Sequence, residues 1–158
     1  NDFQVGLDGV IGGLFIALGE RALPILERRG LFENEASPVD QRHLLQALRF
    51  CWEYPSDTVP RTEVILITRK LLPVPHLTRE VIVDLSRYMD WDFRNQIVAM
   101  WDTLGGEGPL IRPAIVGYLL ACPSEKSASL LAQLREKNIE LFEKAQQAAA
   151  IPFPAAAP

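Results

Sequence analysis

Apolar residues recur along this chain mainly at steps of three and four, the spacing of amphipathic helices, and few segments alternate with a period of two. Proline and glycine separate the periodic segments at regular intervals. Small polar residues stand where helices should begin, at Ser37, Asp92 and Ser124. The pattern therefore predicts an all-α chain of about seven helices. Their expected ranges are 7–29 (which Pro24 could interrupt), 39–53, 60–72, 77–89, 92–104, 111–122 and 124–147.

The helical segments are expected to form one domain over residues 1–148, an ordinary size for a single hydrophobic core. Residues 149–158 end in IPFPAAAP, whose prolines and small residues are typical of a disordered tail or a linker. The sequence opens with NDFQ rather than Met, so an export signal could have been removed, and the compartment stays open.

One unit of sequence recurs along the chain. When the sequence is shifted by 33 residues, Arg79 falls on Arg112 and Arg61 falls on Arg94. Five segments share an arginine followed by apolar residues three, six and ten positions later, which places those side chains on one helical face. We interpret them as helix-pair repeats, with a non-repetitive helical bundle as the alternative. The units are Arg42 with Leu45, Leu48 and Trp52; Arg61 with Val64, Ile67 and Leu71; Arg79 with Ile82, Leu85 and Met89; Arg94 with Ile97, Met100 and Leu104; and Arg112 with Ile115, Tyr118 and Cys122.

Residues 38–135 resemble HEAT-like repeat proteins in three respects: the helices are short, proline stands at helix starts, and an early arginine accompanies an acidic residue in a nearby turn. The motifs of tetratricopeptide and ankyrin repeats are absent. The resemblance implies short antiparallel helix pairs that stack as an α-solenoid, because one pair cannot bury its apolar face alone.

The resemblance also implies a role for the arginines. In HEAT-like proteins, turn carboxylates and helix arginines often form ladders that fix the stacking of repeats, and a guanidinium can hold a carboxylate bidentately. The alternative is a basic row that binds an acidic partner or a phosphate backbone. No acid lies just upstream of Arg79, so we expect this arginine to be available to a ligand. The acids that precede the other arginines are Asp40, Asp57, Asp92 and Glu107.

Two tryptophans join Arg79 as candidate partner-binding residues. Trp91 and Trp101 lie on either side of one predicted helix. Trp101 is seven residues after Arg94, at a position where the other units mostly carry polar residues, so it could mark an interface hot spot. Packing in the core is the alternative.

The overall charge argues against some partners. The chain has 16 basic and 20 acidic residues and a net charge of −4, which disfavours nonspecific binding to nucleic acid or to an anionic membrane. The longest apolar stretch near its start, residues 9–18, is too short to span a bilayer, so we expect no transmembrane segment.

No motif points to a metal, a cofactor or an activated nucleophile. Neither histidine has a second His or Cys at a ligand spacing, and HExxH, GxSxG and phosphate-loop patterns do not occur. Cys51 and Cys122 are expected to be buried thiols rather than a disulfide. The carboxylates are best explained as solvated groups on the protein surface. We therefore expect no enzymatic activity and, in the absence of a binding motif, no cofactor. An enzyme on a HEAT-like scaffold, which is one alternative, would use Asp84 or Asp90 as its acid.

Together these observations predict a non-catalytic protein-interaction or scaffold module that works as a subunit or part of a larger assembly. Its expected partner is another protein, contacted through Arg79, Trp91 and Trp101. A nucleic-acid-binding protein is the remaining alternative, which the net charge disfavours.

Overall fold

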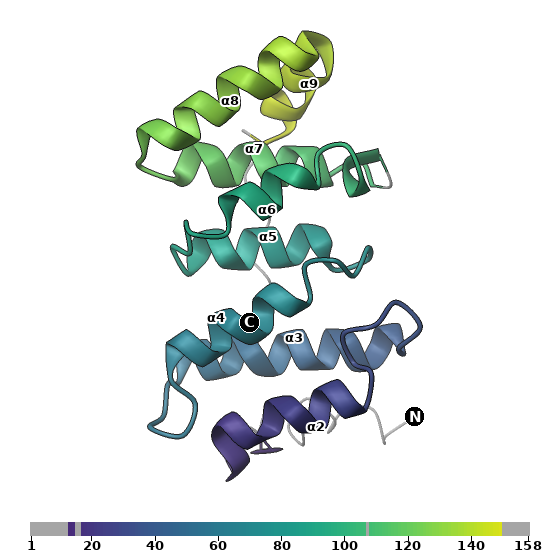
Figure 1. Ribbon diagram of the computed structural model, residues 1–158, viewed down its shortest axis with the longest axis vertical. Helices are drawn as coiled ribbons and strands as arrows, with labels where there is room; N and C mark the ends of the chain where they lie inside the picture. Colours follow the sequence, from purple (N-terminus) through teal and green to yellow (C-terminus); the bar gives the residue numbers. More distant parts are fainter. Residues whose placement is uncertain (1–12, 15–16, 107, 150–158) are drawn as a thin grey trace. The chain divides into compact units, whose positions relative to one another are not determined.

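The computed structural model describes residues 13–14, 17–106 and 108–149. Within these residues the chain forms α-helices and short 3₁₀ helices without any β-strand, which confirms the all-α prediction (Figure 1). None of the described helices is both long enough and apolar enough to cross a membrane. The helices belong to two compact units, Asn1–Leu77 and Thr78–Pro158.

The first unit is built on a helical hairpin in which α3 packs against α4. Ser37 caps α3 by accepting a hydrogen bond from the backbone N–H of Asp40 at 3.4 Å, and Pro38 occupies the first helical position, where its missing N–H costs nothing. Leu44 and Leu48 from α3 and Ile67 from α4 are buried in the core. The elements are η1 Gly19–Arg21, α2 Ala22–Arg28, α3 Pro38–Glu53 and α4 Arg61–Lys70.

Polar side chains connect α2 and the loop that follows it to this hairpin. The buried Gln41 side-chain amide donates hydrogen bonds to the carbonyl oxygens of Leu31 at 3.1 Å and Glu33 at 2.7 Å. Lys70 Nζ lies 2.7 Å from Glu27 Oε1, which joins the end of α4 to α2. Two backbone carbonyl groups of the loop therefore accept hydrogen bonds from a side chain. A segment without regular secondary structure needs such partners for its backbone polar groups.

The second unit is organised around α7, which packs against α5, α6, α8 and α9. Seven of the eleven residues of this helix are buried, as expected for a helix whose apolar residues are not confined to one face. Helix α9 also packs on α7 and on α8, so α5, α7 and α9 form consecutive contacts (Figure 1). The elements are α5 Thr78–Arg87, α6 Arg94–Ala99, η2 Leu104–Gly106, α7 Ile111–Ala121, α8 Glu125–Lys137 and α9 Ile139–Ala149.

Several predicted boundaries were wrong. The single helix expected over 124–147 is two helices, because Asn138 is extended (φ −160°, ψ 99°) and its Oδ1 accepts the backbone N–H of Leu141 at 3.0 Å, capping α9. The helix expected over 92–104 contains only the short α6 followed by turns. The helix expected over 7–29 is interrupted before Pro24, as predicted: Gly19 has φ 52°, the 3₁₀ helix η1 follows, and α2 begins at Ala22 with Pro24 in its first turn.

Part of the prediction falls outside the described residues. The start of the helix expected over 7–29 includes residues 7–12 and 15–16, and the expected tail over 149–158 has only Ala149 among the described residues, at the end of α9.

The apolar positions of the repeated unit are buried to different degrees. The residue three positions after each arginine is buried in all five units. Six positions after it, four residues are buried and Met100 is half-buried. Ten positions after it, only Leu71 and Cys122 are buried, and Met89 is 69% exposed. The periodicity therefore identified the core face over the first two turns of each helix and lost accuracy at the helix ends.

Candidate functional site

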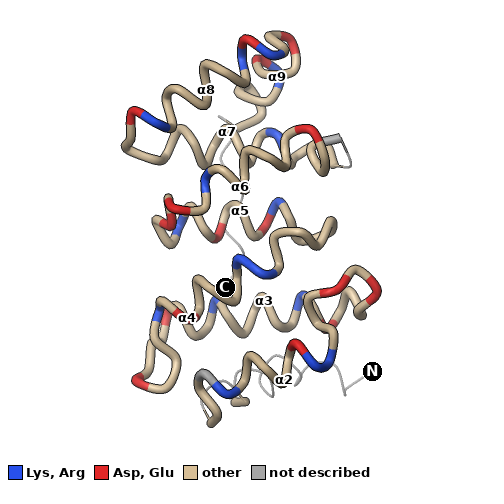
Figure 2. The backbone as a smooth tube through the Cα atoms, in the orientation of Figure 1, with Lys and Arg blue, Asp and Glu red and all other residues tan. Residues whose placement is uncertain are grey.

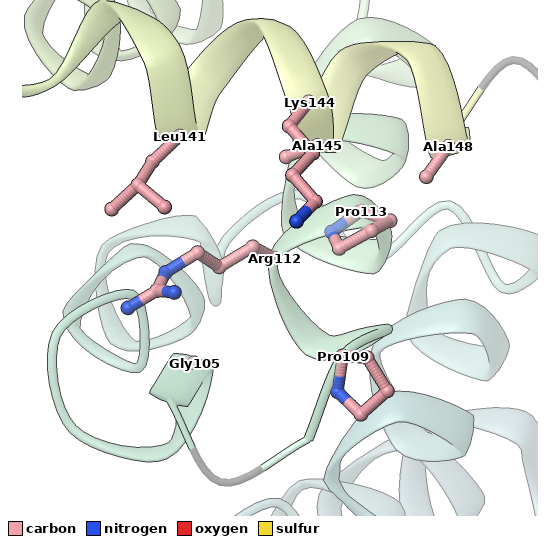
Figure 3. Close-up of a pocket in the computed structure, with 8 residues that line it drawn as sticks. All are labelled: Gly105, Pro109, Arg112, Pro113, Leu141, Lys144, Ala145 and Ala148. Carbon is pink, nitrogen blue, oxygen red and sulfur yellow. The ribbon is translucent and has the colours of Figure 1, made fainter.

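A small pocket opens in the second unit between α7 and α9 (Figure 3). Its volume is about 180 Å³. Two of its lining residues, Arg112 and Lys144, are cationic, and the others are apolar or glycine. The lining residues are Gly105, Pro109, Arg112, Pro113, Leu141, Lys144, Ala145 and Ala148.

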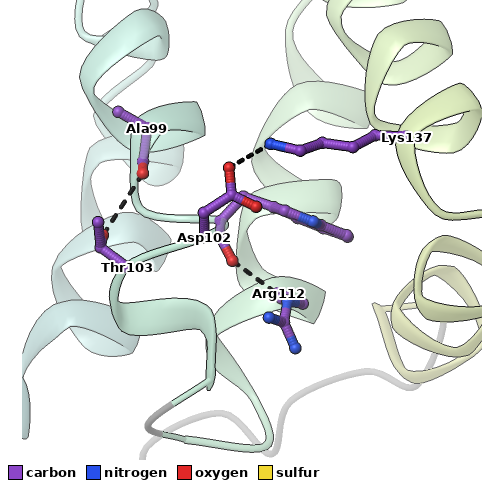
Figure 4. A network of polar contacts seen from close by, with 6 residues as sticks. Ala99, Asp102, Thr103, Arg112 and Lys137 are labelled. Carbon is purple, nitrogen blue, oxygen red and sulfur yellow. Dashed lines mark hydrogen bonds and ion pairs between the residues drawn. The ribbon is translucent and has the colours of Figure 1, made fainter.

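Arg112 is held in place by Trp101 (Figure 4). Its Nε donates a hydrogen bond to the carbonyl oxygen of Trp101 at 3.2 Å, and its guanidinium carbon lies 5.5 Å from the centroid of the Trp101 ring. Gly105 makes room for this arrangement, because a Cβ there would lie 3.0 Å from Arg112 Cγ and 3.1 Å from Nε. In the same region Lys137, at the end of α8, forms an ion pair with Asp102.

The first unit contains the same pairing. Arg61 Nε donates to the carbonyl oxygen of Trp52 at 3.3 Å, and its guanidinium carbon lies 4.7 Å from the Trp52 ring centroid. We call each pair an arginine–tryptophan clasp: Arg61 with Trp52, and Arg112 with Trp101. In both, an arginine at the start of a helix contacts a tryptophan that precedes the intervening loop, so the clasp closes that connection.

The described residues show none of the three ion pairs that short spacing suggested between an acid and the arginine that follows it. No ion pair joins Asp57 to Arg61 or Asp92 to Arg94 there, and Arg94 Nη1 instead contacts Cys122 Sγ at 3.9 Å. Arg42 and Asp40 likewise form no ion pair within the described chain, and Glu107 lies outside it. An exposed carboxylate gains little from such a pair, whereas a guanidinium gains a buried contact surface from an indole ring.

Arg79 is not the available arginine that its upstream sequence suggested. It is half-buried, is the second residue of α5, and takes part in an interaction within the structure. Arg112 lines the pocket instead. The glycine at position 105, which leaves room for the Arg112 side chain, is the sequence signal that points to this arginine.

The two candidate tryptophans differ in exposure. Trp101 is 2% exposed, so its ring packs in the core, which was the alternative for this residue. Trp91 is half-buried and meets Tyr118 edge-on, with ring centroids 5.2 Å apart. The hydroxyl of Tyr118 donates a hydrogen bond to the backbone carbonyl oxygen of Asp90. These contacts fix the end of α5 against α7.

The acids proposed for an enzyme are buried. Asp84 is 1% exposed and its Oδ1 lies 3.5 Å from Nη1 of Arg87, and Asp90 is 6% exposed. A general acid has to come within hydrogen-bond reach of its substrate, and neither residue lines the pocket. Within the described residues, no group of three His, Cys, Asp or Glu side chains is placed to hold a metal.

Both cysteines are free and buried, as predicted. Burial raises the pKa of the Cys51 thiol. The thiol is therefore protonated at neutral pH, which makes it a poor nucleophile and metal ligand.

Large apolar side chains are exposed on one face of α3. Val39, Phe50 and Tyr54 are 41%, 49% and 69% exposed, and the rings of Phe50 and Tyr54 are in contact, with centroids 4.9 Å apart. These three residues, with His43 and Gln46 between them, form what we call the outer face of α3. Helical spacing places it opposite Leu44 and Leu48, which are buried. The partner-binding residues predicted from the sequence, Arg79, Trp91 and Trp101, do not include this face.

Charged residues of both signs alternate along the chain in each unit (Figure 2). Together with the net charge of −4, this distribution gives no long basic stretch among the described residues to follow a phosphate backbone.

No protein-family model matches this chain, and no curated protein or solved structure matches it either. What the chain does has therefore to be inferred from its own side chains.

Proposed function

We propose that this chain is a non-catalytic protein-interaction or scaffold module, and that a protein partner docks on the outer face of α3. The observation that carries the proposal is the contacting pair Phe50 and Tyr54, exposed on the side of α3 that faces away from the core. Aromatic side chains contribute most of the binding energy at many protein interfaces, because they bury a large area with few rotatable bonds.

The surroundings of this pair support docking rather than chance exposure. A single exposed apolar residue is normal on a protein surface, whereas contiguous apolar residues mark interaction sites. Phe50 lies in the last turn of α3 and contacts Tyr54, the residue that follows the helix, and Val39 lies three turns earlier on the same face as Phe50. His43 and Gln46 between them would provide polar contacts at the rim of an interface.

A repeat architecture is the second part of the proposal. In the unit that follows Leu77, α5 packs on α7 and α7 packs on α9, so alternate helices of the chain are neighbours. Such contacts between alternate helices are typical of HEAT-like solenoids, which present extended surfaces to partners. A scaffold of this kind would belong to a larger assembly.

The test is affinity capture with the whole chain, comparing the wild type with the double substitution Phe50→Ser and Tyr54→Ser. The matched control is Leu120→Ser, which removes a similarly exposed leucine (55%) from the other unit. Circular dichroism would first establish that all three proteins have the same helical content. We expect the wild type and the control to recover the same stoichiometric protein, and the double variant to lose it.

Two results would contradict the proposal. If the double variant recovers the partner as well as the wild type does, the outer face of α3 is not the docking surface. If the wild type recovers no protein but binds heparin with an affinity that falls steeply with salt, the chain binds nucleic acid instead.

A further inference from the structure

We propose that the pocket between α7 and α9 binds a carboxylate carried on a short apolar group. The pocket lies within one compact unit, and it shares no residue with the outer face of α3. The proposal therefore does not depend on the docking surface argued above.

On the cationic side of the pocket, Arg112 has a fixed orientation that suits the binding of an anion. The Arg112 Nε is already committed to the carbonyl oxygen of Trp101, and the Trp101 ring lies against the guanidinium, so the side chain has a fixed orientation. The two terminal nitrogens of Arg112 make no hydrogen bond or ion pair with the described residues. They form a planar pair of donors that matches the two oxygens of a carboxylate.

A second cation reaches the same pocket from α9. Lys144 points toward Pro113, and the Arg112 guanidinium extends toward the Gly105 side of the pocket (Figure 3). Within the described chain Lys144 has no ion pair, and none of the residues that line the pocket is acidic. Both cations line the same pocket, so each would attract an anion bound there.

The remaining lining residues of the pocket indicate which chemical group should be attached to the carboxylate. Pro109, Pro113, Leu141, Ala145 and Ala148 give the pocket an apolar lining. Its volume of about 180 Å³ is close to that of the apolar cavity of about 150 Å³ that accommodates benzene in an engineered protein. A small aromatic ring or a branched aliphatic group would fill the space.

The chemistry favours a carboxylate over a phosphate. Phosphate sites usually use several backbone N–H groups, often at a helix N-terminus. Here Pro109 lies two residues before α7 and Pro113 is the third residue of the helix, and proline has no N–H to donate. The pocket therefore offers few donors beyond the two side chains, which suits the two oxygens of a carboxylate.

The test is an NMR titration of the full-length chain with benzoate, and with acetate and inorganic phosphate as comparison anions. We expect benzoate to shift the signals of Arg112 Nε and of the Ala145 and Ala148 amides, and to bind at least about tenfold more tightly than either comparison anion. A short peptide that ends in phenylalanine, titrated beside its C-terminal amide, tells whether a chain terminus is a better source of the carboxylate than a free acid.

Substitutions separate the pocket from general surface charge. Lys144→Gln should weaken benzoate binding about fivefold, whereas Lys126→Gln, which removes an exposed cation from the first turn of α8, should leave it unchanged. Ala148→Leu should block the pocket without removing a charge. Arg112→Lys retains the charge but removes the planar donor pair, and it should also weaken binding.

The proposal is overturned if benzoate binds no better than acetate, or if phosphate binds more tightly than benzoate. It is also overturned if Lys144→Gln and Ala148→Leu both leave the benzoate affinity of a fully helical protein unchanged.

Discussion

Replacing Met89 with glycine should stabilise the protein. Helix α5 ends in a Schellman motif, in which the Asp90 N–H donates to the Leu85 carbonyl at 2.9 Å and the Met89 N–H donates to the Ser86 carbonyl at 3.0 Å. This geometry puts Met89 at φ 56°, in the left-handed region that glycine adopts without strain. Met89 is 69% exposed, so its side chain gains little burial in return.

Helix α2 ends in the same motif with the residue that the geometry favours. Gly30 has φ 65°, its N–H donates to the Glu27 carbonyl at 2.9 Å, and the Leu31 N–H donates to the Leu26 carbonyl at 3.2 Å. The two helix ends therefore provide a comparison within one chain, because the backbone arrangement is shared and the residue in the left-handed position differs.

The size of the effect follows from two opposing terms. A side chain in the left-handed region costs about 1–2 kcal/mol, which glycine would recover. Glycine also gives the unfolded chain more freedom, which costs about 0.4–1 kcal/mol. The net gain from Met89→Gly should be about 0.5–1 kcal/mol, which corresponds to an increase in Tm of roughly 1–4 °C for a chain of this size.

Thermal unfolding followed by circular dichroism measures this difference. Met89→Ala is the matched control, because alanine retains the left-handed strain and should leave Tm nearly unchanged. Gly30→Ala introduces the strain at the other helix end and should lower stability by about 1 kcal/mol. If Met89→Gly leaves Tm unchanged or lowers it while Gly30→Ala is destabilising, backbone strain at Met89 is not the relevant term.

Three further substitutions test other contacts. Gly19 has φ 52° and a Cβ there would overlap the carbonyl oxygen of Thr58, so Gly19→Ala should lower the free energy of unfolding by about 2 kcal/mol or more in a urea titration; a neutral result would contradict this close approach. Tyr118→Phe removes the hydroxyl that donates to the Asp90 carbonyl and should cost about 1–2 kcal/mol in the same assay, and a change near zero would show that water replaces the hydroxyl. Burial raises the pKa of Cys51 above 9.0, so the unfolded chain loses the thiol proton first and stability should fall as pH rises above 9.0; Cys51→Ala should reduce that slope, and an unchanged slope would assign it to other groups.

The sequence predicted the helical class and most helix positions because these depend on local spacing. The ranges expected for α3, α4, α5 and α7 differ from the observed ones by at most two residues at each end, and the apolar residue three positions after each arginine is buried. Such positions are decided within one or two turns of helix, where periodicity and proline placement are informative.

Helix ends inside apolar or helix-favouring runs, and contacts between distant residues, were harder to predict. Asn138 lies within a run of good helix formers, and only its extended backbone and its hydrogen bond to Leu141 show that it separates two helices. The pocket cations come from α7 and α9, and Arg112 and Lys144 lie 32 residues apart in sequence. Neither spacing nor composition places such residues together, because their proximity depends on how the helices pack.

The arginines illustrate both outcomes. Their recurrence was visible in the sequence, but the contacts of Arg61 with Trp52, nine residues earlier, and of Arg112 with Trp101, eleven residues earlier, were not. In each clasp the guanidinium lies against the indole ring of the tryptophan, and the arginine Nε donates to the backbone carbonyl of the same tryptophan. These contacts leave the two terminal nitrogens of the guanidinium available. In the first unit the clasp closes the α3–α4 connection, whereas in the second the same device also orients Arg112 along the wall of a pocket. The contact with tryptophan fixes the arginine side chain without neutralising its charge. A residue that stabilises the packing of the chain can in this way also bind an anion.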